Sequence, residues 1–373
     1  MKWMFWIAAA WIGYSYLGYP VWLWLRSRWS PRPVRRSHEE PAVSAVMVVR
    51  NEEATVARKL ENLLSLDYPE GKLEVVAVCD GSSDGTGAIL EQFARGGRVR
   101  TLVKPVSQGK AAGLNDAVQL ASGEVLLFTD ARQQIEPEAL RLLVENFADP
   151  DVGAASGELM LGDPATGETG KGMGLYWRVE KKIRDLESAS GSVAGATGAI
   201  YCARRSLIEP LPDGTILDDV LLPMQIVRQG ARVIFDPRAR AWDSPDLGES
   251  REFARKVRTL SGNYQLLQLA PWLLSSKNPI RIEFISHKLS RLAVPFALLA
   301  LLLASLFLSE PLYRAALIAQ LAFYALSVLA IAGVRIGPLA RIADPARTFV
   351  VLNCAAVVAF INFVTGRKAV WVR

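Results

Sequence analysis

Short apolar runs alternate with amphipathic stretches through the polar part of the chain. Four runs rich in Val, Leu and Ala have the length and composition of buried strands: 42–49, 73–80, 99–105 and 123–130. The stretches that separate and follow them repeat apolar residues at helical spacing: 53–66, 85–95, 109–121 and 136–147. Strands that alternate with helices in this way form a mostly parallel sheet with helices on both faces. The pattern therefore predicts an α/β domain from about Pro41 to Pro245.

Longer apolar segments lie on both sides of this domain. Residues 3–25 carry no charged side chain and are long enough to cross a bilayer as a helix. Three further segments of this kind follow the domain, at 292–308, 315–333 and 348–364. Residues 250–291 are basic and amphipathic and too polar to span, which is typical of helices on a membrane surface. The hydropathy pattern therefore predicts a multi-pass membrane protein with one polar domain.

These segments predict five parts along the chain. They are an N-terminal transmembrane anchor (1–27), the α/β domain (38–248), interfacial amphipathic helices with a basic motif (249–291), three C-terminal transmembrane helices (292–366) and a basic tail (367–373).

Arginines set the expected orientation in the membrane. Lys2 alone precedes the first span, whereas five arginines follow it directly: Arg26, Arg28, Arg32, Arg35 and Arg36. The positive-inside rule then places the α/β domain in the cytoplasm, at the inner (plasma) membrane. The same count leaves the C-terminal residues Arg367, Lys368 and Arg373 outside, against the rule, so the topology of the last span stays open.

Composition narrows the classes of function. The net charge is +6, but the positive side chains cluster beside apolar segments instead of forming one basic tract. That distribution is typical of membrane flanks, and nucleic acid is not expected as a partner. Cys79, Cys202 and Cys354 lie far apart without CxxC spacing. Their spacing argues against a zinc site or a disulfide framework and indicates a reducing compartment.

Polar residues follow three of the predicted strands, where ligands of parallel sheets bind. These strand ends are Arg50-Asn51-Glu52, Cys79-Asp80-Gly81 and Thr129-Asp130-Ala131. A carboxylate such as Asp80 can accept hydrogen bonds from a ribose or a base, and a glycine such as Gly81 lets the backbone pass close to that ligand. A turn followed by a helix cap would have a similar sequence.

Four motifs occur in order at these positions: VVRNEEATVARKLENLL (48–64), VCDGSSDGT (78–86), QGKAAGLNDA (108–117) and FTDAR (128–132). Together they resemble the membrane-bound family 2 glycosyltransferases, in particular the branch of cellulose, hyaluronan and poly-N-acetylglucosamine synthases. The resemblance implies a GT-A fold, which is Rossmann-like, and a nucleotide-diphosphate-sugar donor, with a UDP-sugar expected. It also implies that the nucleotide contacts Asn51, Glu52, Asp80 and Lys110.

Asp130 is the predicted metal ligand. It ends a strand, and Arg132 occupies the place where a second carboxylate often stands. A hard cation that keeps its waters needs only one or two carboxylates besides phosphate oxygens. We therefore expect Mg²⁺ or Mn²⁺ to bridge Asp130 and the donor diphosphate, in a looser site than two acids would form. Arg132 either points away or pairs with phosphate.

The acceptor side follows from two later segments. In ILDDVLLPMQIVRQGARVIFDP (216–237) the resemblance places the general base at Asp219, with Asp218 as its acidic partner. An inverting transfer needs one carboxylate to deprotonate the acceptor hydroxyl as it attacks. Paired acids also favour a helix start, and both roles are compatible. The small residues of 191–208 resemble the family's acceptor loop, with Thr197 and Gly198 as contacts.

A basic motif lies in REFARKVRTLSGNYQLL (251–267), where the polysaccharide synthases carry Q-R-x-R-W. Arg255, Lys256 and Arg258 take its first, second and fourth places, which implies contact with the leaving diphosphate. Thr259 stands at the tryptophan position, and Tyr264 and Trp272 are candidates to replace that ring. A basic helix on anionic lipid would have the same pattern. Further on, His287 is expected to be an interfacial residue.

The preferred hypothesis is an inverting hexosyltransferase that extends a polysaccharide at the membrane. Thr259 and the small number of spans favour an alternative, transfer of one sugar to a lipid acceptor. Arg132 favours another, a catalytically silent nucleotide-binding subunit. A transporter fits poorly because the spans hold almost no ionisable residues.

Overall fold

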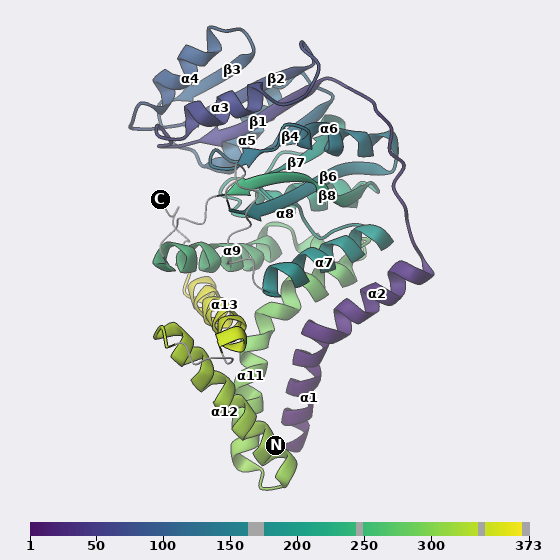
Figure 1. The fold of residues 1–373 in the computed structure, drawn as a ribbon, viewed down its shortest axis with the longest axis vertical. Helices are drawn as coiled ribbons and strands as arrows, with labels where there is room; N and C mark the ends of the chain where they lie inside the picture. The colour runs from purple at the N-terminus through teal and green to yellow at the C-terminus, as the bar shows by residue number, and fades with distance from the viewer. Residues whose placement is uncertain (163–174, 244–248, 335–339, 368–373) are drawn as a thin grey trace.

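The structure is a computed structural model that describes residues 1–162, 175–243, 249–334 and 340–367. It has an α/β domain at one end and a group of long helices at the other (Figure 1). The domain is built on an eight-stranded sheet with the order β3-β2-β1-β4-β7-β6-β8-β5. The strands are β1 (Val43–Val49), β2 (Leu73–Asp80), β3 (Val99–Lys104), β4 (Val125–Phe128), β5 (Gln134–Ile135), β6 (Val152–Leu161), β7 (Tyr201–Arg204) and β8 (Arg232–Asp243).

The sheet is mixed, and its first half is parallel as predicted. Strands β3, β2, β1 and β4 run in one direction. Strand β7 is antiparallel to both β4 and β6, while β6 and β8 are parallel to each other and β5 is antiparallel to β8. The fourth strand is shorter than the predicted 123–130, because it ends at Phe128 and leaves Thr129 and Asp130 beyond the ladder.

Helices cover both faces of the sheet and bury its apolar side chains. On one face α3 (Val56–Leu64), α4 (Thr86–Ala94) and α6 (Ala139–Val144) contribute apolar residues to one core cluster. On the other face α5 (Lys110–Leu120) and α8 (Asp218–Arg228) contribute to a second cluster. Each fully buried Leu or Ile contributes about 1.5–3 kcal/mol, so this layered packing fixes the strand ends that carry the site.

The reversal at β7 brings two loops together. Because β7 is antiparallel to β4, Tyr201 at its start pairs with Phe128 at the end of β4. The two rings stack with centroids 4.6 Å apart and an interplanar angle of 6°. The loop before β7 therefore lies at the same edge as the loop after β4. This edge carries Asp130.

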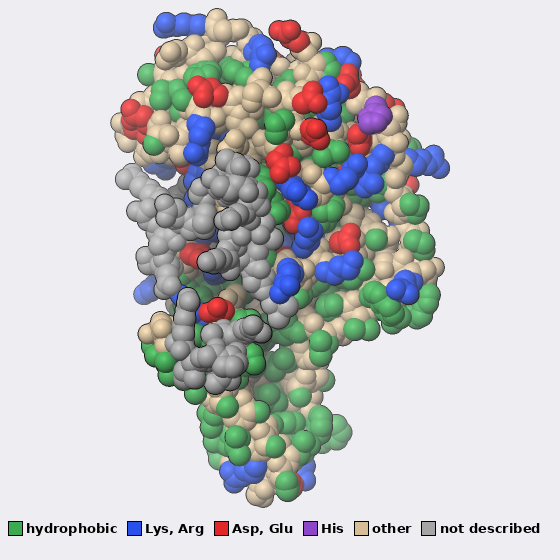
Figure 2. Space-filling view, in the orientation of Figure 1, with side chains coloured by type: hydrophobic (Ala, Val, Ile, Leu, Met, Phe, Trp, Pro, Cys, Tyr) green, Lys and Arg blue, Asp and Glu red, His purple; other side chains and the backbone are tan. Residues whose placement is uncertain are grey.

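Three helical segments are long and apolar enough to cross a membrane: Arg281–Phe307, Pro311–Ile331 and Ile342–Val364. They comprise α10 (Arg281–Phe284), the π-helix η5 (Ile285–Leu289), α11 (Ser290–Phe307), α12 (Pro311–Ile331) and most of α13 (Ala340–Val364). Hydrophobic side chains are frequent on the narrow end of the molecule, and charged side chains lie at its tip (Figure 2). The first segment begins before the predicted residue 292, since the helix continues unbroken from Arg281. The second begins at Pro311, where proline suits the first helical turn.

The N-terminal segment is also helical and packs along α11. It consists of α1 (Lys2–Gly13), the π-helix η1 (Tyr14–Gly18) and α2 (Tyr19–Trp29). Its predicted role as a membrane anchor stays a prediction.

Between the domain and the spans lie α7 (Leu175–Ser190) and α9 (Glu249–Leu269), both roughly crosswise to the long helices (Figure 1). The chain then passes through the 3-10 turn η4 (Pro271–Leu274) to reach α10. Two short 3-10 turns complete the α/β domain: η2 (Glu145–Ala148) and η3 (Arg205–Leu207). Of the predicted basic tail, residues 368–373 lie outside the described residues.

Candidate active site

Lys110 connects two acidic parts of the predicted site. It is the first residue of α5 and follows Gly109, whose φ of +95° suits glycine. Its Nζ lies 2.9 Å from Oδ1 of Asp130 and 3.0 Å from Oδ2 of Asp218. Burial alone would lower the pKa of Lys110, but Asp130 and Asp218 outweigh it and raise that pKa. A fixed cation therefore joins the strand-end carboxylate to the start of α8.

Asp219 lies next to this group, in the first turn of α8. The backbone N–H of Gly198 donates to its Oδ2 over 3.2 Å, and its own carbonyl accepts the N–H of Ala196 over 2.7 Å. Burial and the nearby charge of Asp218 raise the pKa of Asp219 to about 6. A carboxylate with such a pKa is ionised at neutral pH and is a stronger base than an exposed aspartate. Asp219 therefore has the properties of a general base.

Gly198 lies close to both acidic groups. A Cβ added at Gly198 would lie 3.3 Å from Oδ2 of Asp130 and 3.5 Å from Oδ2 of Asp219. Carboxylate oxygens of the predicted metal ligand and the predicted base thus both border the small space at the Cβ position of this glycine. The neighbouring Thr197 is held by its N–H, which donates to Oγ of Ser156 over 3.0 Å.

Asp80 has a different environment from the one expected. It is only 1% exposed, and its carboxylate accepts hydrogen bonds from Ser107 Oγ and from the N–H groups of Gln108 and Gly109, at 2.7, 2.8 and 2.9 Å. Burial opposes ionisation, yet these hydrogen bonds lower the pKa of Asp80. In this structure Asp80 holds the loop that leads into Lys110. Its contact with a ribose or base stays a prediction.

Gly81 allows two loops of the chain to approach each other. Its φ is +63°, and a Cβ there would lie 2.3 Å from the backbone nitrogen of Ser107. The expectation that Gly81 makes room for a ligand was therefore incomplete, because the close neighbour is the 106–107 backbone.

Asn51 and Glu52 organise the loop after β1. Asn51 has a left-handed φ of 54°, and its Oδ1 accepts the N–H of Ser83 over 2.9 Å. The N–H of Glu52 donates to Oγ1 of Thr86 over 2.9 Å. These contacts tie together the first two strand ends, next to the Asp80 loop. The proposed nucleotide contacts are thus adjacent in space.

The basic motif is only partly brought to the site. Arg255 on α9 lies 3.9 Å from Asp243, and Arg132 lies 3.4 Å from the same carboxylate. Arg132 thus has an acidic partner in Asp243, and both alternatives for it, pointing away from the cation or pairing with phosphate, stay predictions. Lys256 pairs with Glu252 on its own helix. Arg258 lies one turn after Arg255 on α9, and contact of all three with a diphosphate stays a prediction.

The two candidates to replace the missing tryptophan have other packing partners. Tyr264 stacks on Phe363 of α13 with ring centroids 5.2 Å apart. Trp272 packs under the guanidinium of Arg228, 4.5 Å from its ring centre. Both rings therefore stabilise contacts between α9 or η4 and neighbouring helices.

His287 is buried in the protein, with 3% exposure, and its predicted position at the membrane interface stays a prediction. Its Nδ1 lies 2.8 Å from Glu187 and its Nε2 lies 2.8 Å from Glu180, both on α7. The phenol of Tyr19 also donates to Glu187, over 2.5 Å. The sequence concealed this network because its partners are about a hundred residues or more apart.

A divalent cation at this site would have few protein ligands, with Asp130 as the candidate that the sequence predicts. Among the described residues no group of three or more His, Cys, Asp or Glu side chains could hold a metal ion. The side chain of Asp130 is 40% exposed, and one of its oxygens is already paired with Lys110. Its other oxygen, beside Gly198, suits a hard cation whose remaining ligands are phosphate oxygens and water.

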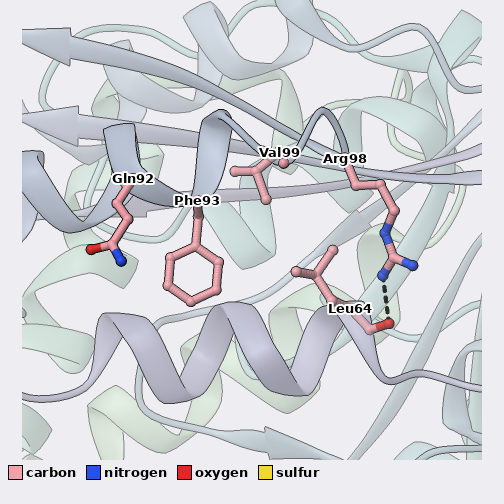
Figure 3. Close-up of a pocket in the computed structure, with 6 residues that line it drawn as sticks. Leu64, Gln92, Phe93, Arg98 and Val99 are labelled. Carbon is pink, nitrogen blue, oxygen red and sulfur yellow. Dashed lines mark hydrogen bonds between the residues drawn. The ribbon is translucent and has the colours of Figure 1, made fainter.

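A surface pocket elsewhere in the domain is not part of this site (Figure 3). It is lined by Leu64, Gln92, Phe93, Gly96, Arg98 and Val99, and Arg98 donates to the Leu64 carbonyl over 2.6 Å. These residues lie at the C-terminal ends of α3 and α4 and the start of β3, the edge opposite Asp80 and Asp130. Its lining residues include none of the predicted site residues.

Known proteins share this sequence pattern. Residues 44–210 match the family model described as glycosyl transferase family 2. The poly-beta-1,6-N-acetyl-D-glucosamine synthase of Staphylococcus epidermidis is 25% identical over 245 residues, which cover 64% of this chain and 59% of that protein. The beta-monoglucosyldiacylglycerol synthase of Synechocystis sp. is 28% identical over 192 residues, which cover 50% of this chain and 40% of that protein. The matched region thus spans little more than half of the first relative and less than half of the second.

A solved structure shares the fold over nearly the whole chain. The mannosyltransferase PcManGT from Pyrobaculum calidifontis, described in complex with GDP-Man and Mn²⁺, has a TM-score of 0.73 at 22% sequence identity. The match covers 98% of this chain and 100% of that one. The expected GT-A fold class is confirmed. The structural match also extends over the helices that follow the α/β domain.

Proposed function

We propose, from the premise that residues 44–210 form a glycosyltransferase family 2 domain, that the protein is an inverting membrane transferase. It moves a sugar from a nucleotide-diphosphate-sugar to a growing polysaccharide. The observation that carries this proposal is that Asp130 and Asp219 both border the Cβ position of Gly198, with carboxylate oxygens 3.3 and 3.5 Å from it. A base and a diphosphate-side carboxylate that share one small space suit the two ends of an in-line displacement.

The chain's own residues account for the proton and the charge. Asp219 takes the proton of the acceptor hydroxyl as its oxygen attacks the anomeric carbon. The bond from that carbon to the diphosphate oxygen breaks, and the diphosphate leaves with the bonding electrons. Asp130 would hold a divalent cation, Mg²⁺ or Mn²⁺, which when bound neutralises diphosphate charge. The ammonium of Lys110 lies between the carboxylates of Asp130 and Asp218 and offsets their charge.

The donor is proposed to lie over the first strand ends, against Asn51, Glu52 and the loop that Asp80 holds. We propose a UDP-sugar, while GDP-sugars belong in the test because PcManGT was described with GDP-Man. Arg255, Lys256 and Arg258 on α9 are proposed to contact the leaving diphosphate, since cations there would stabilise its growing charge.

The acceptor distinguishes two versions of the proposal. The similarity to a poly-beta-1,6-N-acetyl-D-glucosamine synthase supports a polysaccharide. The similarity to a glycosyldiacylglycerol synthase supports a lipid acceptor, and α9 lies between the domain and the apolar helices, close to where a lipid would arrive. We propose the polysaccharide first and the lipid as the second candidate.

The proposed location is the inner (plasma) membrane, with the α/β domain in the cytoplasm. Three apolar helices of suitable length and the exposed tryptophans Trp3, Trp24 and Trp29 of the N-terminal helix support it. The proposed parts remain an anchor (1–27), a catalytic domain (38–248), interfacial helices (249–291), a C-terminal membrane region (292–366) and a short tail.

The test is nucleoside-diphosphate release from a panel of UDP- and GDP-sugars, with purified protein in nanodiscs. Asp219→Asn should lower turnover by roughly 10²–10⁴-fold, the usual contribution of a general base, and leave nucleotide binding intact. Asp213→Asn is the matched control, because Asp213 is an exposed acid in the preceding turn. Binding of a nucleotide with no turnover of any donor would contradict the proposal and support a silent subunit.

Sizing of the radiolabelled product separates the two acceptors. A ladder or a large polymer supports the polysaccharide version. A single labelled product that partitions with lipid supports the second candidate and overturns the first.

A further inference from the structure

Lys59 is a buried lysine beneath the Asp130 loop that the mechanism above does not use. It lies on the sheet-facing side of α3, together with Val56, Leu60 and Leu63, and is only 2% exposed. Removing an ammonium from water costs several kcal/mol unless other groups compensate it. A lysine at such a position therefore needs a specific reason to be there.

The ammonium of Lys59 holds both ends of the loop that carries Asp130. Its Nζ donates to Oγ1 of Thr129 over 2.8 Å and to the carbonyl of Gln133 over 2.7 Å. These two residues directly bracket Asp130, Ala131 and Arg132. One side chain thus fixes the start and the end of the turn after β4.

No carboxylate in the described ranges lies within ion-pair distance of Lys59, in contrast to Lys110 with its two acidic partners. Burial lowers the pKa of Lys59 to about 7, and the charge of Asp130 opposes that shift. Two neutral oxygens, Oγ1 of Thr129 and the carbonyl of Gln133, together with the charge of Asp130, therefore compensate the buried ammonium.

The same contact reaches the acceptor loop. While it accepts from Lys59, the hydroxyl of Thr129 donates to the carbonyl of Ala199 over 2.8 Å. Ala199 follows Gly198, whose N–H donates to Asp219. A continuous path of hydrogen bonds and chain therefore runs from Lys59 to both sides of the space where the donor and the acceptor are proposed to meet.

We propose that Lys59 is a positioning residue: it fixes the Thr129–Gln133 loop so that Asp130 faces the cation and the diphosphate, and through Thr129 it holds the Gly198 loop against Asp219. This inference rests on the proposed function. Lys59 touches neither donor nor acceptor and acts through the backbone and side chains that it holds.

The experiment measures metal binding separately from turnover. Wild-type protein in nanodiscs is titrated with UDP and with GDP by calorimetry, in EDTA and with Mn²⁺, and free Mn²⁺ is followed by its EPR signal. In Lys59→Met, which keeps length but loses the donors, the Kd of Mn²⁺ with bound nucleotide should rise about tenfold, as for loss of a buried charged donor. Nucleotide binding in EDTA should stay within about twofold, because the Asp80 loop is untouched.

Turnover and a control complete the test. At saturating Mn²⁺, kcat of Lys59→Met should fall about tenfold or more while KM for the donor changes little, since misplaced groups mainly affect the transition state. Lys72→Met is the matched control, because Lys72 is exposed directly before β2 and its ammonium donates to the Glu40 carbonyl. It should match wild type in both measurements.

The outcomes separate this inference from the function on which it rests. A wild-type protein that binds neither nucleotide with Mn²⁺ overturns the proposed function and this inference together. Metal-dependent binding in wild type with an equal Mn²⁺ affinity and kcat in folded Lys59→Met overturns the role of Lys59 alone. If Lys59→Met does not fold, Thr129→Val decides instead: it removes the shared hydroxyl and should weaken Mn²⁺ binding about threefold, and an unchanged affinity there overturns the inference.

Discussion

The N–H of Gly198 donates to Oδ2 of Asp219 over 3.2 Å, so a backbone group of the acceptor loop orients the proposed base. Oδ2 of Asp130 and Oδ2 of Asp219 both lie close to the Cβ position of the same glycine. Position 198 therefore has two requirements: a backbone N–H that can donate to Asp219, and no side chain.

Gly198→Ala tests the second requirement. The new methyl would lie 3.3 Å from Asp130 and 3.5 Å from Asp219, so one carboxylate must shift. We expect kcat to fall about tenfold or more, with a stability loss of about 1–3 kcal/mol, as for other overpacked sites. Gly13→Ala is the control, because a Cβ there meets nothing within 4 Å. Wild-type kinetics in Gly198→Ala would show that the two carboxylates do not share one working space.

The pKa of Asp219 sets the expected pH dependence. Burial and the Asp218 charge raise that pKa to about 6, and the base must be unprotonated to accept a proton. The rate should therefore fall as the pH is lowered through about 6, by about tenfold per pH unit below it. The profile of kcat/KM from acid to neutral pH measures this. A midpoint near about pH 4, the ordinary value for aspartate, would contradict the assignment.

Lys110→Met should move that midpoint upward. The positive charge of Lys110 lowers the pKa of Asp219, so its removal leaves the base beside two uncompensated carboxylates and raises the pKa further. At pH 7 we expect activity to fall about tenfold or more, with partial recovery at higher pH. Lys182→Met, on the exposed side of α7 beside Asp185, should keep the wild-type profile. A lowered rate with an unmoved midpoint would mean that Lys110 acts only through structure.

Metal removal tests the role of Asp130. EDTA should abolish turnover, and Mn²⁺ or Mg²⁺ should restore it, because a cation is needed beside a single carboxylate to neutralise the diphosphate. Asp130→Asn should raise the Mn²⁺ concentration for half-maximal rate about tenfold or more, since the ligand loses its charge. Asp213→Asn again serves as the control. Full activity in EDTA would remove Asp130 from the donor site.

Most of the parallel half of the fold could be predicted from sequence, because β1 to β4 and α3 to α5 are strongly periodic and locally encoded. The antiparallel insertion of β7 could not. It is only four residues long, and its place between β4 and β6 depends on long-range packing such as the Phe128–Tyr201 stack.

The site residues divide in the same way. Asp130 and Asp219 stand in motifs at the end of a strand and the start of a helix, so the sequence could predict that they belong to one site. Lys59 carried a signal that was passed over: it falls at helical spacing among Val56, Leu60 and Leu63, on the apolar face of α3. The partners of His287 could not be anticipated, because Glu180 and Glu187 precede it in the sequence by 107 and 100 positions.

The contacts of the N-terminal helix have a consequence for the order in which the protein is made. Trp11 donates to the carbonyl of Ser290, which lies 279 residues later in the chain, and Tyr19 donates to Glu187, which lies 168 residues later. Since the ribosome releases the N-terminus first, this helix completes synthesis long before its polar partners exist. On the proposed membrane topology, the helix stays in the translocation machinery or the lipid until the start of α11 has been made.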